Sequence, residues 1–372
     1  MSRRAVARID LGAIRHNAAL LARAAGGARL MAVVKADGYG HGAVAAARAA
    51  LEGGAGALAV AAVAEAEELR AAGIGAPVLV MGPLSGDEWD RAAAAGAEVT
   101  AWTPAAVARA ASAAAGRGAR ARVHLKLDTG MGRLGARPED VAPLAEAASA
   151  AADVDVVGLM THLATADETE GPNAPFMAEQ IVRFRAAAAA LADRFPGAAL
   201  HAANSAATLR DPGAAFDMVR CGIALYGCSP FLDDPTAHGL RPAMSLVSYL
   251  GAVKTIRSRE SVGYGRAWRA VRGTRVGLVP VGYADGYARA MSGRAEVLVA
   301  GRRAPVVGTI SMDQLTVDLG PGGAEEPGDE VVLLGAQGGE RITAEELAGA
   351  RGTISYEITC AVGARVPRVH EA

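Results

Sequence analysis

The chain has 372 residues, a length more typical of two domains than of one. Hydrophobic residues make up 51% of it, which is enough for large cores, although alanine inflates that share and buries little area. The net charge is −1 and no basic stripe alternates with aromatic residues, so we expect no nucleic-acid partner. No apolar run approaches the roughly 20 residues that span a bilayer, so we expect no membrane association.

The three cysteines, Cys221, Cys228 and Cys360, form no CxxC pair and no even set. We therefore expect neither a disulfide framework nor a metal site. The first residues, MSRRAVARIDLGAIRHN, contain no apolar signal core and no cleavage site. These features predict a reducing compartment, the cytoplasm.

The first 230 or so residues alternate short apolar runs with alanine-rich helical stretches. The predicted strands are Leu30–Lys35, Ala57–Ala61, Pro77–Met81, Glu98–Trp102, Val123–Leu127, Val154–Thr161, Leu200–Asn204 and Met218–Arg220. The predicted helices include Glu65–Ala72, Asp87–Ala95, Pro104–Ala115, Pro138–Ala151 and Pro175–Arg194. Eight strands joined by helices indicate an α/β fold, a (β/α)8 TIM-like barrel over residues 1–235. A doubly wound open sheet is the alternative, but it rarely needs eight strands in this length.

The residue composition and the predicted secondary structure change after about Pro235. Segments such as SLVSYLGAVKTI and APVVGTISMDQLTVDL are rich in β-branched residues and are separated by Gly, Pro, Asp and Arg. One short helical stretch, Ala344–Ala350, interrupts them. We therefore predict a smaller, mostly β C-terminal domain over residues 236–372.

Polar residues recur where the predicted barrel strands end: Lys35, Lys126, His162, Asn204, Ser205 and Arg220. The carboxyl ends of barrel strands line one mouth, which is where active sites of this fold lie. Each residue alone could be an ordinary polar group of a loop. Their shared position favours a single site.

The block VVKADGYGHG, residues 33–42, contains the first of these residues. Lys35 directly follows an apolar run, and burial of its stem disfavours the charged ammonium. Such a lysine can form a Schiff base and can also act as a base. The glycines on either side of Tyr39 allow the backbone to approach a ligand closely. The alternative is a lysine whose charged end reaches solvent at the barrel rim.

This block and LKLDTGMGRLG, residues 125–135, resemble motifs of the alanine racemases, which are fold-type III enzymes dependent on pyridoxal 5'-phosphate (PLP). Nine blocks follow the family order from Ala7 to Pro367. The resemblance implies that Lys35 carries the cofactor and is a catalytic base, and that Tyr39 donates its hydroxyl to the cofactor phosphate. The family usually has alanine in place of Gly38, a difference that loosens the loop without removing chemistry.

The second block implies roles for two cations. Arg133 would help to position the substrate carboxylate and would touch the cofactor's phenolic oxygen. Lys126 is carbamylated in many relatives, and the carbamate then directs Arg133. The alternative for Lys126 is a core lysine paired with Asp128.

Three further barrel blocks match: THLATAD (161–167), HAANSAATL (201–209) and VRCGIALYG (219–227). The resemblance places His162 in a hydrogen-bonded relay towards Arg220. It places the cofactor, chiefly its phosphate, against Asn204, Ser205, Gly222 and Ile223. Arg220 would face the pyridine nitrogen. A guanidinium donates hydrogen bonds but does not readily give up a proton, so the ring would withdraw less charge and transamination would be suppressed.

The C-terminal domain supplies the remaining expected groups. Tyr264, in VGYGRAW, resembles the family's second catalytic base, contributed by the partner subunit of a head-to-tail homodimer. Met312 would bind the substrate carboxylate through its backbone N–H. Tyr283 and Asp313 match the entry corridor, and Tyr356 is expected at the phosphate.

We therefore expect an isomerase that interconverts L- and D-alanine by a two-base mechanism, with D-alanine supplied for peptidoglycan as is usual in the family. A racemase with a broader substrate range is the first alternative. A decarboxylase of the same fold type is disfavoured by Arg220, because those enzymes carry an acidic residue at the ring nitrogen. A non-catalytic PLP-binding protein resembles the barrel alone, and the long β domain argues against it.

Overall fold

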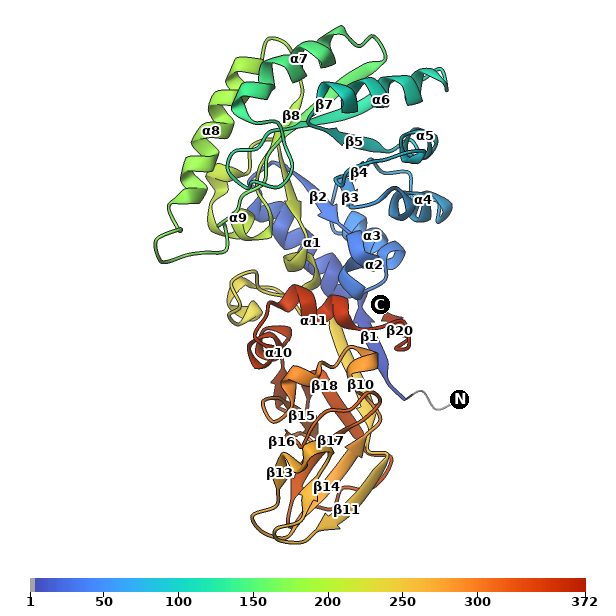
Figure 1. Ribbon diagram of the computed structural model, residues 1–372, viewed down its shortest axis with the longest axis vertical. Helices are drawn as coiled ribbons and strands as arrows, with labels where there is room; N and C mark the ends of the chain where they lie inside the picture. The colour runs from blue at the N-terminus through green and yellow to red at the C-terminus, as the bar shows by residue number, and fades with distance from the viewer. Residues whose placement is uncertain (1–3) are drawn as a thin grey trace. The chain divides into compact units, whose positions relative to one another are not determined.

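The computed structural model describes residues 4–372, which divide into two compact units (Figure 1). The barrel unit comprises residues 14–225 and 238–240. The β unit comprises residues 4–13, 226–237 and 241–372. Within residues 4–372, no helix combines the length and the apolar character that crossing a membrane requires.

The barrel unit confirms the predicted (β/α)8 architecture. All eight strands run parallel, in the order β8-β7-β6-β5-β4-β3-β2-β9. Their bounds are β2 (Arg29–Val33), β3 (Ala57–Val60), β4 (Val78–Val80), β5 (Glu98–Ala101), β6 (Ala121–Lys126), β7 (Val154–Met160), β8 (Ala199–His201) and β9 (Met218–Cys221). Two backbone hydrogen bonds close the ring between the β8 and β9 segments, Asp217 N to Leu200 O (3.0 Å) and Arg220 N to Ala203 O (2.9 Å).

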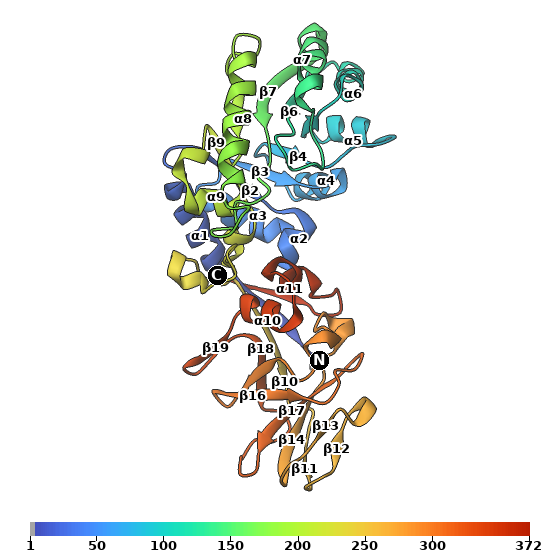
Figure 2. The ribbon, with the colours of Figure 1, turned by 60° about the vertical axis from the view of Figure 1, so that its left-hand side comes forward.

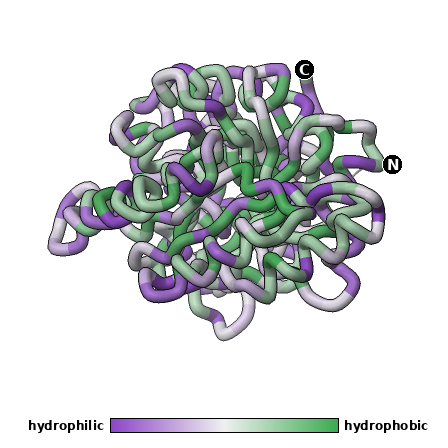
Figure 3. The backbone as a smooth tube through the Cα atoms, turned by 90° about the horizontal axis from the view of Figure 1, so that it is seen from above, coloured by the Kyte–Doolittle hydropathy of each residue, from purple (hydrophilic) through white to green (hydrophobic). Residues whose placement is uncertain are grey.

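Helices cover the outside of the barrel strands (Figure 1). They are α1 (Leu11–Ala24), α3 (Ala43–Glu52), α4 (Val63–Ala71), α5 (Glu88–Ala94), α6 (Pro104–Ala115), α7 (Val141–Ala150), α8 (Phe176–Leu191) and α9 (Ser205–Arg210). Helix α6 has the predicted bounds because Pro104 occupies its first turn and the Thr103 hydroxyl accepts the Ala106 N–H (3.1 Å). In the end-on view, hydrophobic segments are concentrated towards the middle and hydrophilic ones are prominent in peripheral loops (Figure 3).

The β unit is a mostly antiparallel sheet of ten strands (Figure 2). Its strands are β1 (Val6–Asp10), β10 (Met244–Tyr249), β11 (Ala252–Ile256), β14 (Thr274–Val279), β15 (Glu296–Val299), β16 (Arg302–Val307), β17 (Leu315–Gly320), β18 (Glu330–Gln337), β19 (Glu340–Ile342) and β20 (Arg368–Glu371). A separate hairpin pairs β12 (Ser261–Val262) with β13 (Trp268–Arg269), and two helices, α10 (Ala344–Arg351) and α11 (Ser355–Ala361), complete the unit.

Two features differ from the predicted organisation. Strand β1, which the sequence placed in the barrel domain, pairs antiparallel with β10 and parallel with β20 in the β unit. Its partners are hundreds of residues away, and local periodicity carries no information about such pairing. Helix α11 was not predicted, because its residues Ile358 and Thr359 are β-branched and favour strands.

Candidate active site

Lys35 does not end the first barrel strand as predicted. Strand β2 ends at Val33, and Lys35 opens a short helical segment, α2 (Lys35–Gly40). Four successive residues in it, Ala36 to Tyr39, have φ between 52° and 61°, so the chain makes a left-handed turn. Left-handed backbone costs a non-glycine residue about 1–2 kcal/mol. Strain of this kind is concentrated at functional sites, where surrounding contacts maintain it.

Two carboxylates hold this turn in place. The Asp37 carboxylate accepts the Ala43 N–H (2.9 Å). The Glu65 carboxylate accepts three backbone N–H groups, those of Ala36 (2.6 Å), Ala61 (2.7 Å) and Ala62 (3.1 Å). Glu65 therefore ties the peptide that directly follows Lys35 to the start of α4.

A polar cradle lies where the left-handed turn meets the end of β9. A Cβ atom built on Gly222 would overlap the Tyr39 hydroxyl and lie 2.8 Å from the Tyr39 Cζ, so only glycine permits this approach. The Ser205 Oγ accepts the Gly222 N–H (3.0 Å). The Ile223 N–H has no acceptor among residues 4–372. Hydroxyls and backbone N–H groups gathered in this way suit an anion, and barrels commonly bind phosphate at this position.

Asn204 has a structural role next to Ser205, as the cap of helix α9. Its side-chain oxygen accepts the Ala207 N–H (3.0 Å) and so caps helix α9, which begins at Ser205. Strand β8 ends at His201, before the predicted Asn204. Asn204 thus orients the helix end that carries Ser205.

Arg220, on β9, is buried and held by backbone carbonyls. One terminal nitrogen donates to the His201 carbonyl (2.9 Å) and lies 3.0 Å from the His201 Nδ1. The other donates to the carbonyls of Thr161 (2.7 Å) and Ala202 (3.1 Å). Burial lowers the pKa of Arg220 to about 10. Its Nε–H has no acceptor in the described part of the chain, which leaves that donor available to a ligand.

The mouth of the barrel is strongly cationic. Lys126, the last residue of β6, is buried, and burial together with the charges of Arg220, Arg133 and Lys35 lowers its pKa to about 8. Burial and the same cations hold the pKa of His162 well below its ordinary value. The Nδ1 of His162 lies 3.4 Å from an Arg220 nitrogen. The predicted residues Lys35, Lys126, Arg133, His162 and Arg220 are therefore brought within electrostatic range of one another.

Asp128 organises the loop that carries Arg133. Its carboxylate accepts the N–H groups of Gly130 (2.9 Å) and Gly132 (3.1 Å), an arrangement that forms a tight turn. Asp128 thus serves the backbone and also attracts Lys126 electrostatically. Arg133 is exposed in the chain.

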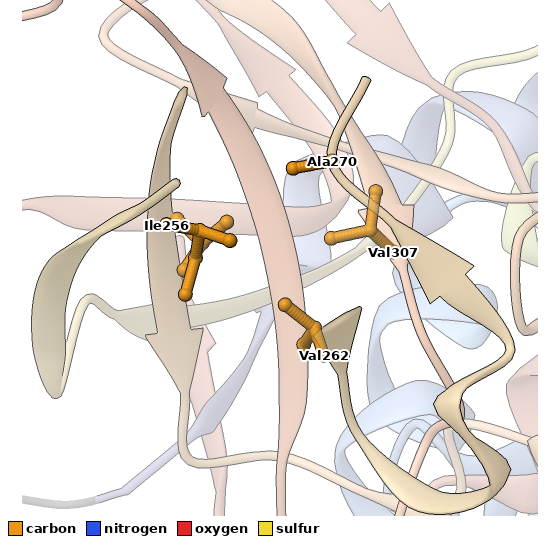
Figure 4. Close-up of a cluster of buried hydrophobic side chains, with 5 residues drawn as sticks. Ile256, Val262, Ala270 and Val307 are labelled. Carbon is orange, nitrogen blue, oxygen red and sulfur yellow. The ribbon is translucent and has the colours of Figure 1, made fainter. Parts of the chain in front are cut away.

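In the β unit, Tyr264 is presented on the β12–β13 hairpin. Val262 precedes it and packs into a buried cluster with Ile256, Ala270, Val276 and Val307 (Figure 4). The Tyr264 carbonyl accepts the Thr309 hydroxyl (3.0 Å). The side chain of Tyr264 is nevertheless 72% exposed. The hairpin is therefore anchored by apolar packing while its tyrosine remains accessible.

The other predicted residues of the β unit lie in adjoining loops and in α11. Met312 and Tyr283 are exposed, and their segments are joined by the Tyr283 N–H to the Ser311 carbonyl (3.1 Å). The Met312 N–H has no acceptor within residues 4–372. Asp313 forms an ion pair with Arg365 (2.8 Å). Tyr356 lies in α11.

Sequence reasoning missed several residues that support the site. Glu65 was assigned only to a helix, and His124, His201 and Glu98 received no role. A polar residue at an inward position of a buried strand was the available signal, because His124 and Glu98 interrupt apolar runs. Their partners could not be identified, since they lie on other strands.

A (β/α)8 barrel with an anion cradle and a cationic, lysine-bearing mouth defines the class of barrel enzymes that bind a phosphorylated ligand. Comparison with known proteins narrows this class. Residues 9–230 match the family described as alanine racemase, N-terminal domain, and residues 243–370 match alanine racemase, C-terminal domain. The chain therefore belongs to the alanine racemase family.

Individual relatives agree with the family match. The alanine racemase of Symbiobacterium thermophilum is 46% identical over 366 residues, which cover 98% of this chain and 96% of the relative. That of Thermobifida fusca is 46% identical, with 100% and 99% covered. The crystal structure of alanine racemase from Streptomyces lavendulae, a producer of D-cycloserine, matches with a TM-score of 0.95 at 43% identity, covering 100% of this chain and 98% of that one.

Proposed function

We propose that the chain interconverts L-alanine and D-alanine, with PLP bound in the barrel through Lys35. The observation that carries this proposal is the close approach of the Tyr39 hydroxyl to Gly222, beside the Ser205 hydroxyl. This cradle fits a phosphate, and the left-handed turn connects it directly to Lys35. Membership of the alanine racemase family is the reason for proposing alanine as the substrate.

The residues fit the cofactor at both ends. Tyr39, Ser205, Gly222 and Ile223 would hold the phosphate, with Asn204 as the cap beneath it and Tyr356 as a further contact. Arg220 would donate its Nε–H to the ring nitrogen. When bound, PLP withdraws electrons from the substrate and makes its α-hydrogen acidic.

Arg220 limits how far that withdrawal goes. Even with a pKa lowered to about 10, the guanidinium remains protonated near neutral pH and donates a hydrogen bond without transferring its proton. Direct return of the α-proton is then favoured over side reactions such as transamination. This property also disfavours the decarboxylase alternative.

Two proton-transfer groups on opposite faces would complete the reaction. Tyr264 of a second copy of the chain would take the α-proton of L-alanine, and the Lys35 ammonium would deliver a proton to the other face. The reverse sequence would convert D-alanine to L-alanine. The anchored hairpin and the 72% exposure of Tyr264 support its contribution to a homodimeric site.

The substrate carboxylate would be bound by Arg133 and by the Met312 N–H, which needs an acceptor. Carbamylation of Lys126 would replace one positive charge of the cationic mouth with a negative one and orient Arg133. Tyr283 and Asp313 would line the entry corridor. We further propose a cytoplasmic location and a role in supplying D-alanine for peptidoglycan, in keeping with Cys221 and Cys228, which are buried thiols without a disulfide.

The test is to incubate purified protein with L-alanine, with and without added PLP, and to measure D-alanine by chiral chromatography. Formation of D-alanine in the parent protein and its loss in Lys35→Ala support the proposal. A PLP-loaded parent that leaves L-alanine unchanged would overturn it and favour a non-catalytic PLP-binding protein. L-serine as a second substrate separates a strict alanine racemase from a broader one.

A further inference from the structure

A chain of buried polar side chains runs inside the barrel away from Arg220. The His201 Nδ1 lies 3.0 Å from an Arg220 nitrogen, and the His201 Nε2 lies 2.8 Å from the His124 Nδ1. The His124 Nε2 lies 2.8 Å from one Glu98 carboxylate oxygen. These three residues are 5% exposed or less.

The chain passes from one end of the barrel to the other. Arg220 is near the carboxyl end of β9, and His201 is the last residue of β8. His124 lies within β6, and Glu98 is the first residue of β5. The other Glu98 oxygen accepts the Nε–H of Arg122 (2.8 Å), whose side chain is 55% exposed. The hydrogen-bonded chain thus ends in solvent, at the mouth of the barrel opposite the candidate site.

Donor and acceptor rules fix the direction of every hydrogen bond in this chain. Arginine can only donate, so the His201 Nδ1 must be an acceptor without a proton. A neutral His201 then carries its proton on Nε2 and donates to the His124 Nδ1. His124 in turn carries its proton on Nε2 and donates to the Glu98 carboxylate. Any other tautomer would place two donors or two acceptors face to face.

The electrostatics agree with this assignment. Burial and the neighbouring Arg220 hold the pKa of His201 well below its ordinary value, so its imidazole is neutral. Burial alone would raise the pKa of Glu98, but the hydrogen bonds from His124 and Arg122 outweigh it and the pKa is lowered. An ionised carboxylate therefore lies at one end of the hydrogen-bonded chain, and a neutral His201 ring lies beside the guanidinium at the other end.

The surrounding backbone leaves room for this chain. A Cβ atom on Gly158 of β7 would overlap the His124 Nδ1 and lie 2.9 Å from the His201 Nε2. The two rings meet edge to face, with centroids 4.9 Å apart. Glycine at position 158 thus makes the His124–His201 hydrogen bond sterically possible.

We propose that Glu98, His124 and His201 are positioning residues that fix the orientation of the Arg220 guanidinium through a hydrogen-bonded chain of single polarity. The inference rests on the proposed function, in which Arg220 faces the ring nitrogen of the cofactor. Without Glu98 and His124, Arg220 would keep its carbonyl contacts, but His201 would no longer be held as the Nε2–H tautomer. Its Nδ1 would then not be fixed as the acceptor that sets the rotation of the Arg220 plane.

The first test measures the tautomers in the unmodified protein. Nitrogen NMR of protein labelled at the histidine ring nitrogens, near neutral pH and with or without PLP, should show His124 and His201 as neutral Nε2–H tautomers. Observation of either ring as Nδ1–H, or as doubly protonated, would overturn the proposal. This measurement does not depend on catalytic activity.

The second test breaks the chain without leaving a buried charge unpaired, because Arg122, the other partner of Glu98, is 55% exposed. The double variant Glu98→Leu, His124→Phe removes both partners, and Gly158→Ala separates the two histidines by steric overlap. We expect kcat to fall by about tenfold or more in each, as is seen when the hydrogen-bond partners of metal-binding side chains are removed, while KM for alanine changes little. The absorption spectrum of bound PLP should also shift.

Thr100→Val is the matched control, because Thr100 lies two residues beyond Glu98 on the same strand. Its hydroxyl forms a buried hydrogen bond with the Val80 carbonyl (3.0 Å), which is not part of the hydrogen-bonded chain. It should leave kcat and the spectrum unchanged. Folded variants with parental kcat and spectrum would contradict the proposed positioning role. An inactive parent protein would instead count against the proposed function, so the two failures are distinguishable.

Discussion

The hydroxyl of Tyr39 lies against the α-carbon of Gly222, so closely that a Cβ atom at position 222 would be 2.8 Å from the Tyr39 Cζ. This contact joins the segment after β2, which carries Lys35, to the segment after β9. Under the proposed function, a group bound through Lys35 at one end would be held at its other end by the cradle of Tyr39, Ser205 and Gly222.

Replacing Gly222 with alanine should weaken PLP binding. The added methyl group would displace the Tyr39 hydroxyl from the cradle and misdirect the Gly222 N–H. We expect the Kd for PLP, measured by absorbance titration of the apo protein, to rise by about tenfold, which corresponds to about 1.4 kcal/mol. Gly116→Ala is the control, since a Cβ there meets its nearest atom at 3.6 Å. Equal affinity in Gly222→Ala and parent protein would remove Gly222 from the cradle.

Replacing Glu65 with alanine should destabilise the turn that follows Lys35. The variant leaves the N–H groups of Ala36, Ala61 and Ala62 without their acceptor, and hydrogen bonds to charged groups contribute about 1.5–3 kcal/mol each. We expect the free energy of unfolding in urea to fall by only about 2 kcal/mol, because the three bonds are exposed and water can replace the lost acceptor, and we expect PLP binding to weaken. Glu68→Ala, on the exposed side of the same helix, should be neutral; a similar loss there would point to a general effect on α4.

Lys126 should react with carbon dioxide at moderately alkaline pH. Carbamylation joins the neutral amine nitrogen to the carbon of CO₂ and releases one proton. Because the pKa of Lys126 is lowered to about 8, its neutral form becomes abundant above that pH, whereas an ordinary lysine stays protonated up to about 10.5. Carbon NMR with labelled bicarbonate should show one carbamate signal that grows through pH 8 and is absent in Lys126→Met. A signal that persists in that variant would assign the carbamate to another amine.

The pattern of apolar runs was sufficient to predict the barrel, because most residues of its strands are buried and alanine-rich helical stretches separate them. Pro104 marked the first turn of α6, as predicted. The left-handed turn at Ala36–Tyr39 was not predictable, since alanine, aspartate and tyrosine do not favour it and only tertiary contacts maintain it.

The candidate site also had a part that the sequence predicted and a part that only the tertiary structure revealed. Lys35, Lys126, His162 and Arg220 could be grouped from their positions near strand ends alone. The pairing of His124 with His201 depends on how the barrel places β6 and β8. No local sequence signal indicates that these two side chains meet. Tyr264 was found through family resemblance, since an isolated strand tyrosine carries no functional signal.

Replacing Tyr264 with phenylalanine should abolish exchange of the α-proton of L-alanine with solvent while leaving the fold intact. Tyr264 is 72% exposed, and the Val262 cluster anchors the hairpin without it. Proton NMR in D₂O follows the exchange directly, and circular dichroism checks the fold. Exchange of L-alanine at the parental rate would exclude Tyr264 as the base for that isomer.

The central claim is that one active site combines Lys35 of one chain with Tyr264 of another, and complementation of two inactive variants tests it most directly. Lys35→Ala and Tyr264→Phe chains carrying different tags are co-expressed, and the mixed dimers are isolated and assayed for racemisation of L-alanine. A shared site predicts that one of the two sites in each mixed dimer is intact, so activity should return to about half of the parental value per dimer. Mixed dimers as inactive as either variant alone would place both groups in the same chain and contradict the account.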